Sequence, residues 1–300
     1  MKKKLVIILG PTAIGKTNLS IKLAKHFKSE IISCDSRQFY KELKVGTAPP
    51  NKAQLHQVRH HFIQDRSINS EFNAGKFENE AINLIETNNN KILFAVGGSG
   101  LYINAICRGL DNIPDVPKDI RNKLTHDYKK NGILWLQKKI KKIDNNYDKK
   151  YDINNPQRML RFIEVYNFTG KSIDYFKTNK TKKRNFDIIK IGLFIDRIKL
   201  YKKINSRVDL MVENGLINEV KSLLNHKNNN ALQTVGYKEI FKYLNKEYTL
   251  DIAIEKIKQN TRNFAKRQIT WLKKDQDINW FKPEQSKEIL DFIEANLLNP

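Results

Sequence analysis

Residues 1–18 read MKKKLVIILGPTAIGKTN, and this stretch decides the fold of the chain. Residues 5–9 form a short, wholly apolar run rich in β-branched side chains, which is typical of a buried parallel strand. The pattern G-x-x-x-x-G-K-T follows at residues 10–17, and apolar residues then recur at helical spacing over 19–27. A glycine-rich loop between a strand and a helix is the setting of the phosphate-binding P-loop. The opening stretch therefore predicts an α/β fold with an anion site at its first loop.

The P-loop pattern gives its residues distinct roles. Gly10 and Gly15 permit backbone conformations that a Cβ would hinder, so that the N–H groups of the loop can point toward phosphate. Lys16 supplies a positive charge, and the Thr17 hydroxyl is suited to hold Mg²⁺, which we expect as the cofactor. The residues expected to bind a diphosphate or nucleotide are Gly10, Pro11, Thr12, Ala13, Ile14, Gly15, Lys16 and Thr17. The alternative is a glycine-rich turn that binds nothing.

The net charge of +23 at pH 7 favours a polyanionic partner such as nucleic acid. Asn-rich runs at residues 88–90 and 228–230 leave a second explanation open, a bias toward Lys and Asn over all surfaces. Two cysteines provide neither a disulfide framework nor a metal cluster, so we expect a cytoplasmic protein. The longest apolar runs have the length of strands, so we expect no membrane span. A monomer is the expected state.

The first third of the chain alternates strand and helix patterns. Strands are expected at residues 30–34 and 91–96, with a helix at 73–86 between them. A proline-marked joint at 111–117 is followed by a charged, helical region, and a strand at 187–195 then returns to the sheet. The prediction is a P-loop NTPase-like parallel sheet flanked by helices, formed by residues 1–110 and 186–300, with an inserted all-helical subdomain at 111–185.

Two further loops should lie at the P-loop edge of this sheet, because the carboxyl ends of parallel strands share one edge. Asp35 follows the second strand, where a carboxylate can act as a general base or bind metal through water, or simply cap the next segment. The third strand ends in GGSG at 97–100, without the Asp that many P-loop ATPases place there. The N–H groups and the Ser99 hydroxyl suit phosphate or developing negative charge, although a tight turn would look the same.

Arg158 and Arg161 stand three residues apart on an expected helix at 156–169. Two arginines on one face can bind a phosphate backbone through bidentate hydrogen bonds. A solvated helix face is the alternative.

Several stretches, in order and over nearly the whole chain, resemble the tRNA dimethylallyltransferases. They are GPTAIGKT (10–17), DSRQFY (35–40), VGTAPP (45–50), HHF (60–62), NAGKF (73–77), VGGSGLY (96–102), QRMLR (157–161), QTVGYKE (233–239) and KRQITWL (266–272). GPTAIGKT alone is shared with many P-loop proteins. Its combination with DSRQFY, VGTAPP and VGGSGLY is specific to this family.

The resemblance implies transfer of a dimethylallyl group from dimethylallyl diphosphate to N6 of the adenine 3′-adjacent to the anticodon of tRNA. Lys16 and Thr17 would hold the diphosphate, Asp35 would take the N6 proton, and Ser99, usually Thr in the family, would bridge to the leaving oxygen. The implied tRNA contacts are Asp35, Ser36, Arg37, Gln38, Ser99, Arg121, Gln157, Arg158, Met159, Leu160 and Arg161, with 111–185 as the tRNA-binding insertion.

Two other functions are compatible with the residues alone. A nucleotide or small-molecule kinase would use ATP at the P-loop, but the acidic metal ligands that it needs at strand ends are scarce. A non-enzymatic RNA-binding protein with a relict P-loop would account for the charge. Transfer of the γ-phosphate of ATP would support the kinase, and a cellular role untouched by Asp35→Ala would support the binding protein.

Overall fold

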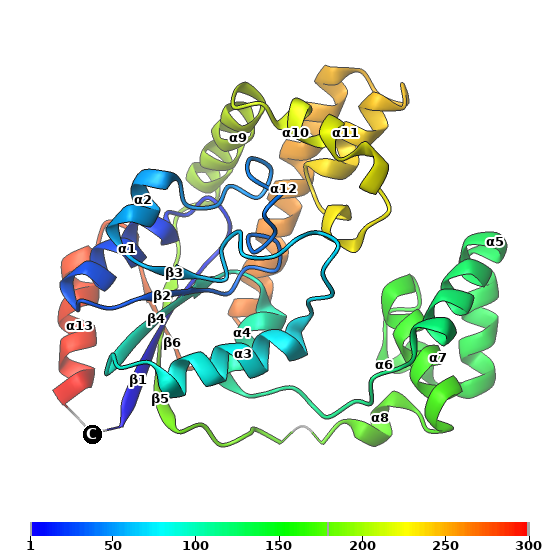
Figure 1. Cartoon of the computed structure of the whole chain (residues 1–300), viewed down its shortest axis with the longest axis horizontal. Helices are drawn as coiled ribbons and strands as arrows, with labels where there is room; N and C mark the ends of the chain where they lie inside the picture. Colours follow the sequence, from blue (N-terminus) through cyan, green and yellow to red (C-terminus); the bar gives the residue numbers. More distant parts are fainter. Residues whose placement is uncertain (1, 179, 299–300) are drawn as a thin grey trace. The chain divides into compact units, whose positions relative to one another are not determined.

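The structure is a computed structural model that describes residues 2–178 and 180–298. Its described residues form one six-stranded sheet in the order β3-β2-β4-β1-β5-β6, in which every pair of neighbours is parallel (Figure 1). The strands are β1 (Lys3–Leu9), β2 (Ile31–Ser33), β3 (His60–His61), β4 (Ile92–Gly97), β5 (Phe186–Leu193) and β6 (Ile278–Phe281). The predicted fold class is confirmed.

The central strand β1 explains why its sequence is apolar without alternation. The side chains from Leu5 to Leu9 are each at most 1% exposed, because helices cover both faces of the sheet. Leu9 pairs with Gly97 of β4 on one side and with Gly192 of β5 on the other. Ser33, the last residue of β2, pairs with Val96. The loops after β1, β2 and β4 therefore leave the sheet at one edge.

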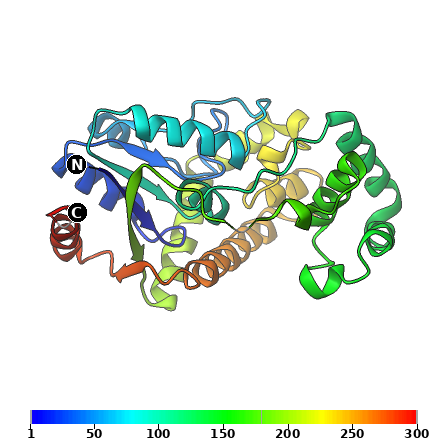
Figure 2. The same ribbon diagram turned by 90° about the horizontal axis from the view of Figure 1, so that it is seen from below.

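Helices of the sheet-containing unit cover the sheet on two sides, and Figure 2 shows α3 (cyan) and α13 (red) on opposite sides of the strands. One layer buries apolar residues of α1, α9, α12 and α13 against Val6 and Ile8. The helices are α1 (Lys16–His26), α2 (Lys52–Gln57), α3 (Ala74–Thr87), α4 (Gly100–Cys107), α9 (Arg197–Glu213), α10 (Leu216–Ser222), α11 (Tyr237–Leu244), α12 (Leu250–Leu272) and α13 (Ser286–Leu298), with short 3-10 helices at Leu224–His226 and Asn230–Leu232. Gly215 is the N-cap of α10 and has φ 92°, a conformation that favours glycine and separates α10 from α9.

The chain divides into two compact units, one formed by 1–108 and 183–300 and the other by 109–182. The described residues of the second unit form helices only: α5 (Lys118–Ile143), α6 (Tyr147–Lys150), α7 (Pro156–Thr169) and α8 (Ile173–Phe176). Gly132 has φ 75° and ψ −173°, so α5 is two helical segments joined at a kink. Tyr147 and Phe162 are buried in the separate core of this unit.

Among the described residues, no helix combines the length and the apolar character that a bilayer crossing requires.

Candidate active site

The P-loop joins β1 to α1 as the sequence predicts. Gly10 has φ 154° and Gly15, the N-cap of α1, has φ 108°, a region that favours glycine. A Cβ on Gly10 would also lie 3.2 Å from the carbonyl oxygen of Leu193 on β5. Both glycines are therefore needed for the shape of this loop.

Lys16 curls back over the loop that precedes it. Its Nζ donates hydrogen bonds to the carbonyl oxygens of Gly10 at 3.0 Å and Pro11 at 2.8 Å. Burial, and then the positive charge of Arg207, lower the pKa of Lys16 to about 7, while Asp35 acts in the opposite direction. An anionic group on the loop would restore the proton to this lysine.

Arg207 of α9 is a site residue that sequence reasoning missed. Its guanidinium donates to Thr12 Oγ1 of the P-loop at 3.2 Å and to the carbonyl oxygen of Ala48 at 3.1 Å. Burial lowers its pKa, and Asp35 opposes that shift. Arg207 is one of several basic residues in α9, and the surrounding sequence carries no motif, so only the fold brings it to the P-loop.

Asp35 and Gln38 order the loop after β2. Asp35 Oδ1 accepts hydrogen bonds from the backbone N–H groups of Arg37 at 2.9 Å and Gln38 at 3.3 Å. Gln38 Nε2 donates to the carbonyl oxygens of Thr47 and Ala48, each at 3.2 Å. Asp35 can cap this loop and also act as the expected general base, because capping uses its carboxylate only as a hydrogen-bond acceptor.

Ser99 connects the loop after β4 to the loop after β2. Its Oγ accepts a hydrogen bond from the backbone N–H of Ser36 at 3.2 Å. Arg37 points its guanidinium at Asn230, donating to the backbone carbonyl oxygen at 2.8 Å and to Oδ1 at 3.2 Å. The loops after β2 and β4 therefore contact each other at the sheet edge where both were expected, while Arg37 holds its loop against another segment of the same unit.

Gln268 of α12 joins the two glycine-rich loops to each other. Its Oε1 accepts from the backbone N–H of Thr12 at 2.9 Å, and its Nε2 donates to the carbonyl oxygen of Gly98 at 2.9 Å. A Cβ on Gly98 would lie 2.2 Å from Nε2, so the glycine allows this close approach. The KRQITWL stretch contains Gln268, but its sequence does not reveal which loops the amide contacts.

The insertion residues have contrasting environments. Arg121 donates two hydrogen bonds to the buried Glu164 carboxylate, each at 2.8 Å, and Arg161 donates to the same carboxylate at 2.7 Å. Met159 and Leu160 are buried in the core of the insertion. Gln157 and Arg158 are exposed.

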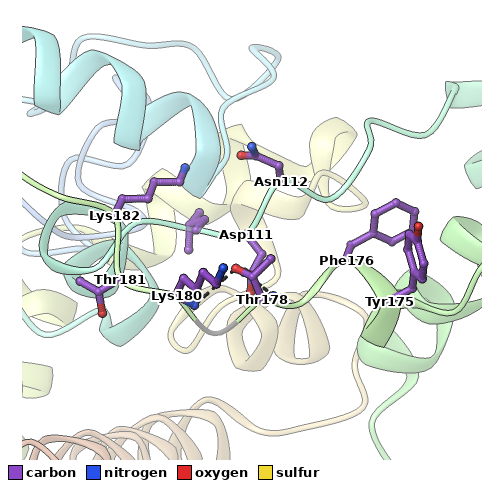
Figure 3. Close-up of a pocket in the computed structure, with 9 residues that line it drawn as sticks. Asp111, Asn112, Tyr175, Phe176, Thr178, Lys180, Thr181 and Lys182 are labelled. Carbon is purple, nitrogen blue, oxygen red and sulfur yellow. Dashed lines mark hydrogen bonds between the residues drawn. The ribbon is translucent and has the colours of Figure 1, made fainter.

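A cavity of about 420 Å³ lies between the two chain segments at the ends of the insertion (Figure 3). Its lining includes Asp111, Tyr175, Phe176 and Thr178. Asp111 Oδ1 accepts from the backbone N–H and the hydroxyl of Thr178, each at 2.9 Å. The carboxylate therefore holds the two segments together within the insertion.

The model of the family described as IPP transferase matches residues 38–275. A tRNA dimethylallyltransferase of Christiangramia forsetii is 50% identical over 99% of both chains, and tRNA dimethylallyltransferase 1 of Bacteroides fragilis is 45% identical over 98% of this chain and 99% of the relative.

Solved structures agree with these relatives. A full-length tRNA isopentenylpyrophosphate transferase from Bacillus halodurans superposes with a TM-score of 0.72 at 36% identity, covering 99% of this chain and 97% of the other. A eukaryotic dimethylallyltransferase described as acting on tRNA superposes with a TM-score of 0.77 at 27% identity, covering 98% and 80%. This chain belongs to the IPP transferase family, the family of these tRNA dimethylallyltransferases.

Proposed function

We propose that this chain transfers a dimethylallyl group from dimethylallyl diphosphate to N6 of the adenine 3′-adjacent to the anticodon of tRNA, giving N6-isopentenyladenosine. The observation that carries the proposal is the meeting of the P-loop, Asp35 and Ser99 at one sheet edge, tied together by Gln268 and Arg207. The relatives named tRNA dimethylallyltransferase support the same reaction, and no comparison favours the kinase.

The P-loop residues 10–17 would bind the donor through its diphosphate. Backbone N–H groups at the start of α1 favour an anion, and Lys16 and Arg207 add two positive charges beside them. Because the diphosphate is the leaving group, these cations stabilise the negative charge that grows on it during transfer.

Mg²⁺ is the cofactor that we propose. The Thr17 hydroxyl lies in the first turn of α1, and the described residues include no group of three or more His, Cys, Asp and Glu side chains suited to a metal by themselves. This donor set fits Mg²⁺, which is commonly held by few protein oxygens together with substrate phosphates. When bound, Mg²⁺ would neutralise charge on the diphosphate.

The reaction is an alkyl transfer in which the nitrogen lone pair of N6 forms a bond to C1 of the dimethylallyl group. The C1–O bond breaks, and its electron pair leaves with the diphosphate. Asp35 takes the proton that N6 gives up, and the Ser99 hydroxyl donates toward the leaving oxygen. The protein thereby removes positive charge from N6 while it stabilises negative charge on the diphosphate.

An adenine in the anticodon loop is already unpaired, so placing it beside Asp35 costs little energy. Ser36, Arg37 and Gln38 follow Asp35 and would contact the base and its neighbours. In the insertion, we propose that Gln157, Arg158 and the exposed part of Arg121 contact tRNA, with Arg161 as a further contact.

The side chains of Met159 and Leu160 are buried, so they would pack α7 against the core of the insertion rather than contact tRNA directly. We propose that the protein acts as a monomer in the cytoplasm.

The test uses purified protein, Mg²⁺, dimethylallyl diphosphate and an unmodified anticodon hairpin with adenine after the anticodon. Mass spectrometry of the digested RNA should show N6-isopentenyladenosine and equimolar diphosphate release. A hairpin with guanine in place of that adenine is the matched control. Absence of alkylated product, or transfer of the γ-phosphate when ATP replaces the prenyl donor, would overturn the proposal.

A further inference from the structure

Glu219 of α10 receives an unusual number of hydrogen bonds from one loop. Its Oε2 accepts from the backbone N–H groups of Lys44 and Val45, each at 2.7 Å, and its Oε1 accepts from that of Gly46 at 2.9 Å. The hydroxyl of Tyr237 donates to Oε1 at 2.7 Å. Three of these four donors are the backbone N–H groups of residues 44–46, so the carboxylate fixes that backbone, because a hydrogen bond to a charged acceptor is stronger than a neutral one.

Residues 44–46 lead directly to Thr47 and Ala48, whose backbone carbonyl oxygens accept hydrogen bonds from site residues. Gln38 Nε2 donates to the carbonyl oxygens of Thr47 and Ala48, and Arg207 donates to that of Ala48. Thr47 is itself held, since its hydroxyl donates to the carbonyl oxygen of Leu43 at 2.7 Å. A displacement of residues 44–46 therefore moves the acceptors of Gln38, next to Asp35, and of Arg207, next to the P-loop.

We propose that Glu219 is a positioning residue for the transfer reaction, acting through the loop 44–48 on Gln38 and Arg207. The expected effect of Glu219 on turnover rests on the proposed function. Its expected effects on the loop and on diphosphate binding do not depend on that function. The carboxylate touches no substrate in this scheme. Through the loop 44–48, Glu219 sets the position of Gln38, next to Asp35, and of Arg207, next to the P-loop.

Graded substitutions of Glu219 give the main test. Glu219→Ala removes all four acceptor contacts, and we expect kcat/KM for transfer to fall about 10- to 100-fold. Glu219→Gln keeps one amide oxygen but turns an N–H₂ group toward backbone donors, so its loss should be smaller. Tyr237→Phe removes a single donor and leaves the three backbone contacts, so transfer should stay within about threefold of the wild type.

Gly46→Ala perturbs the same loop without changing Glu219. A Cβ on Gly46 would lie 2.7 Å from ring atoms of Tyr237, so the loop must shift although Glu219 is intact. This variant should reproduce the kinetic loss of Glu219→Ala. The matched control is Glu213→Gln, which changes an exposed glutamate in the last turn of α9 and should leave the rate unchanged.

Two measurements separate positioning from loss of the fold and from failure of the proposed function. Amide hydrogen exchange of a peptide covering residues 43–50 should be slow in the wild type and at least 10-fold faster in Glu219→Ala, with an unchanged exchange rate in β1. Affinity for inorganic pyrophosphate should fall several-fold in Glu219→Ala, and less in a background that already carries Arg207→Ala. Slow exchange together with wild-type pyrophosphate affinity in Glu219→Ala would overturn the inference. If the wild type itself transfers no prenyl group, the proposed function fails, and these two readouts still decide the role of Glu219.

Discussion

Asp35 has two roles that a single substitution can separate. Its Oδ1 accepts the N–H groups of Arg37 and Gln38, which holds the loop, while proton transfer needs a basic oxygen. Asp35→Asn keeps an acceptor for the loop but cannot take a proton at neutral pH. We expect kcat to fall about 10²- to 10⁴-fold with little change in hairpin affinity. Single-turnover kinetics and fluorescence anisotropy measure the two quantities.

The alanine variant is the comparison for that prediction. Asp35→Ala loses the acceptor as well as the base, so it should bind the hairpin more weakly than Asp35→Asn. Near wild-type turnover in the asparagine variant would show that Asp35 acts only as a cap.

Lys16 makes diphosphate binding depend on pH. Burial and Arg207 lower its pKa to about 7, so above this pH the lysine is largely neutral and must take up a proton to pair with the anion. Affinity for pyrophosphate should therefore fall as pH rises from 7 to 9, relative to Lys16→Arg, which stays charged throughout. Calorimetry in two buffers of different ionisation enthalpy should detect about one more proton taken up per pyrophosphate by the wild type than by Lys16→Arg at pH 8. Equal proton uptake by both proteins would contradict the prediction, since the titration of pyrophosphate itself is common to both.

Among single residues, those that belong to a local sequence motif could be predicted as site residues from the sequence. Asp35 and Ser99 follow strands directly, and the P-loop carries its own signature. Arg207 and Gln268 lie 195 and 256 residues from Thr12 and reach it only because α9 and α12 pack beside the sheet edge. No spacing rule connects such distant residues, so one sequence without its fold could not place them.

At the scale of the element, α7 depends on one buried carboxylate. The Glu164 side chain is 4% exposed and accepts hydrogen bonds from Arg161 of the same helix and from Arg121 of α5, so it links the two helices. Glu164→Ala leaves the half-buried Arg161 without this partner and should destabilise the insertion by about 2–3 kcal/mol. Denaturant unfolding followed by the fluorescence of Trp135, which packs against the insertion core, measures the effect.

A double-mutant cycle isolates this interaction from general damage to the helix. Arg161→Ala alone should cost less than Glu164→Ala, and the double variant should cost less than the sum of the two. Additive costs would show that Arg161 and Glu164 are energetically independent and would contradict the prediction.

The ends of helices could be predicted where a proline or a glycine marks the boundary. Pro156 begins α7 and Gly170, at φ 70°, ends it, as the sequence predicts. The four-residue helices α6 and α8 were not predicted, because a single turn carries no helical periodicity to detect. Helix α11 follows Gly236 and was not predicted either, because its eight residues give too few helical repeats to detect.

At the scale of the whole molecule, the charge of +23 has two explanations that an experiment can distinguish. If basic residues of the insertion contact tRNA phosphates, hairpin affinity should fall with salt by a log–log slope of about −0.7 to −0.9 for each phosphate neutralised. Arg158 is exposed on α7, and Arg158→Ala should make the slope shallower by about one such contact. The matched control is Lys287→Ala, at an exposed lysine of α13 in the other unit. Titrations of the hairpin at several salt concentrations measure both slopes. A general bias toward lysine predicts equal changes in the two variants, whereas a defined tRNA surface predicts a change for Arg158 alone, because only contacts that release counterions enter the slope.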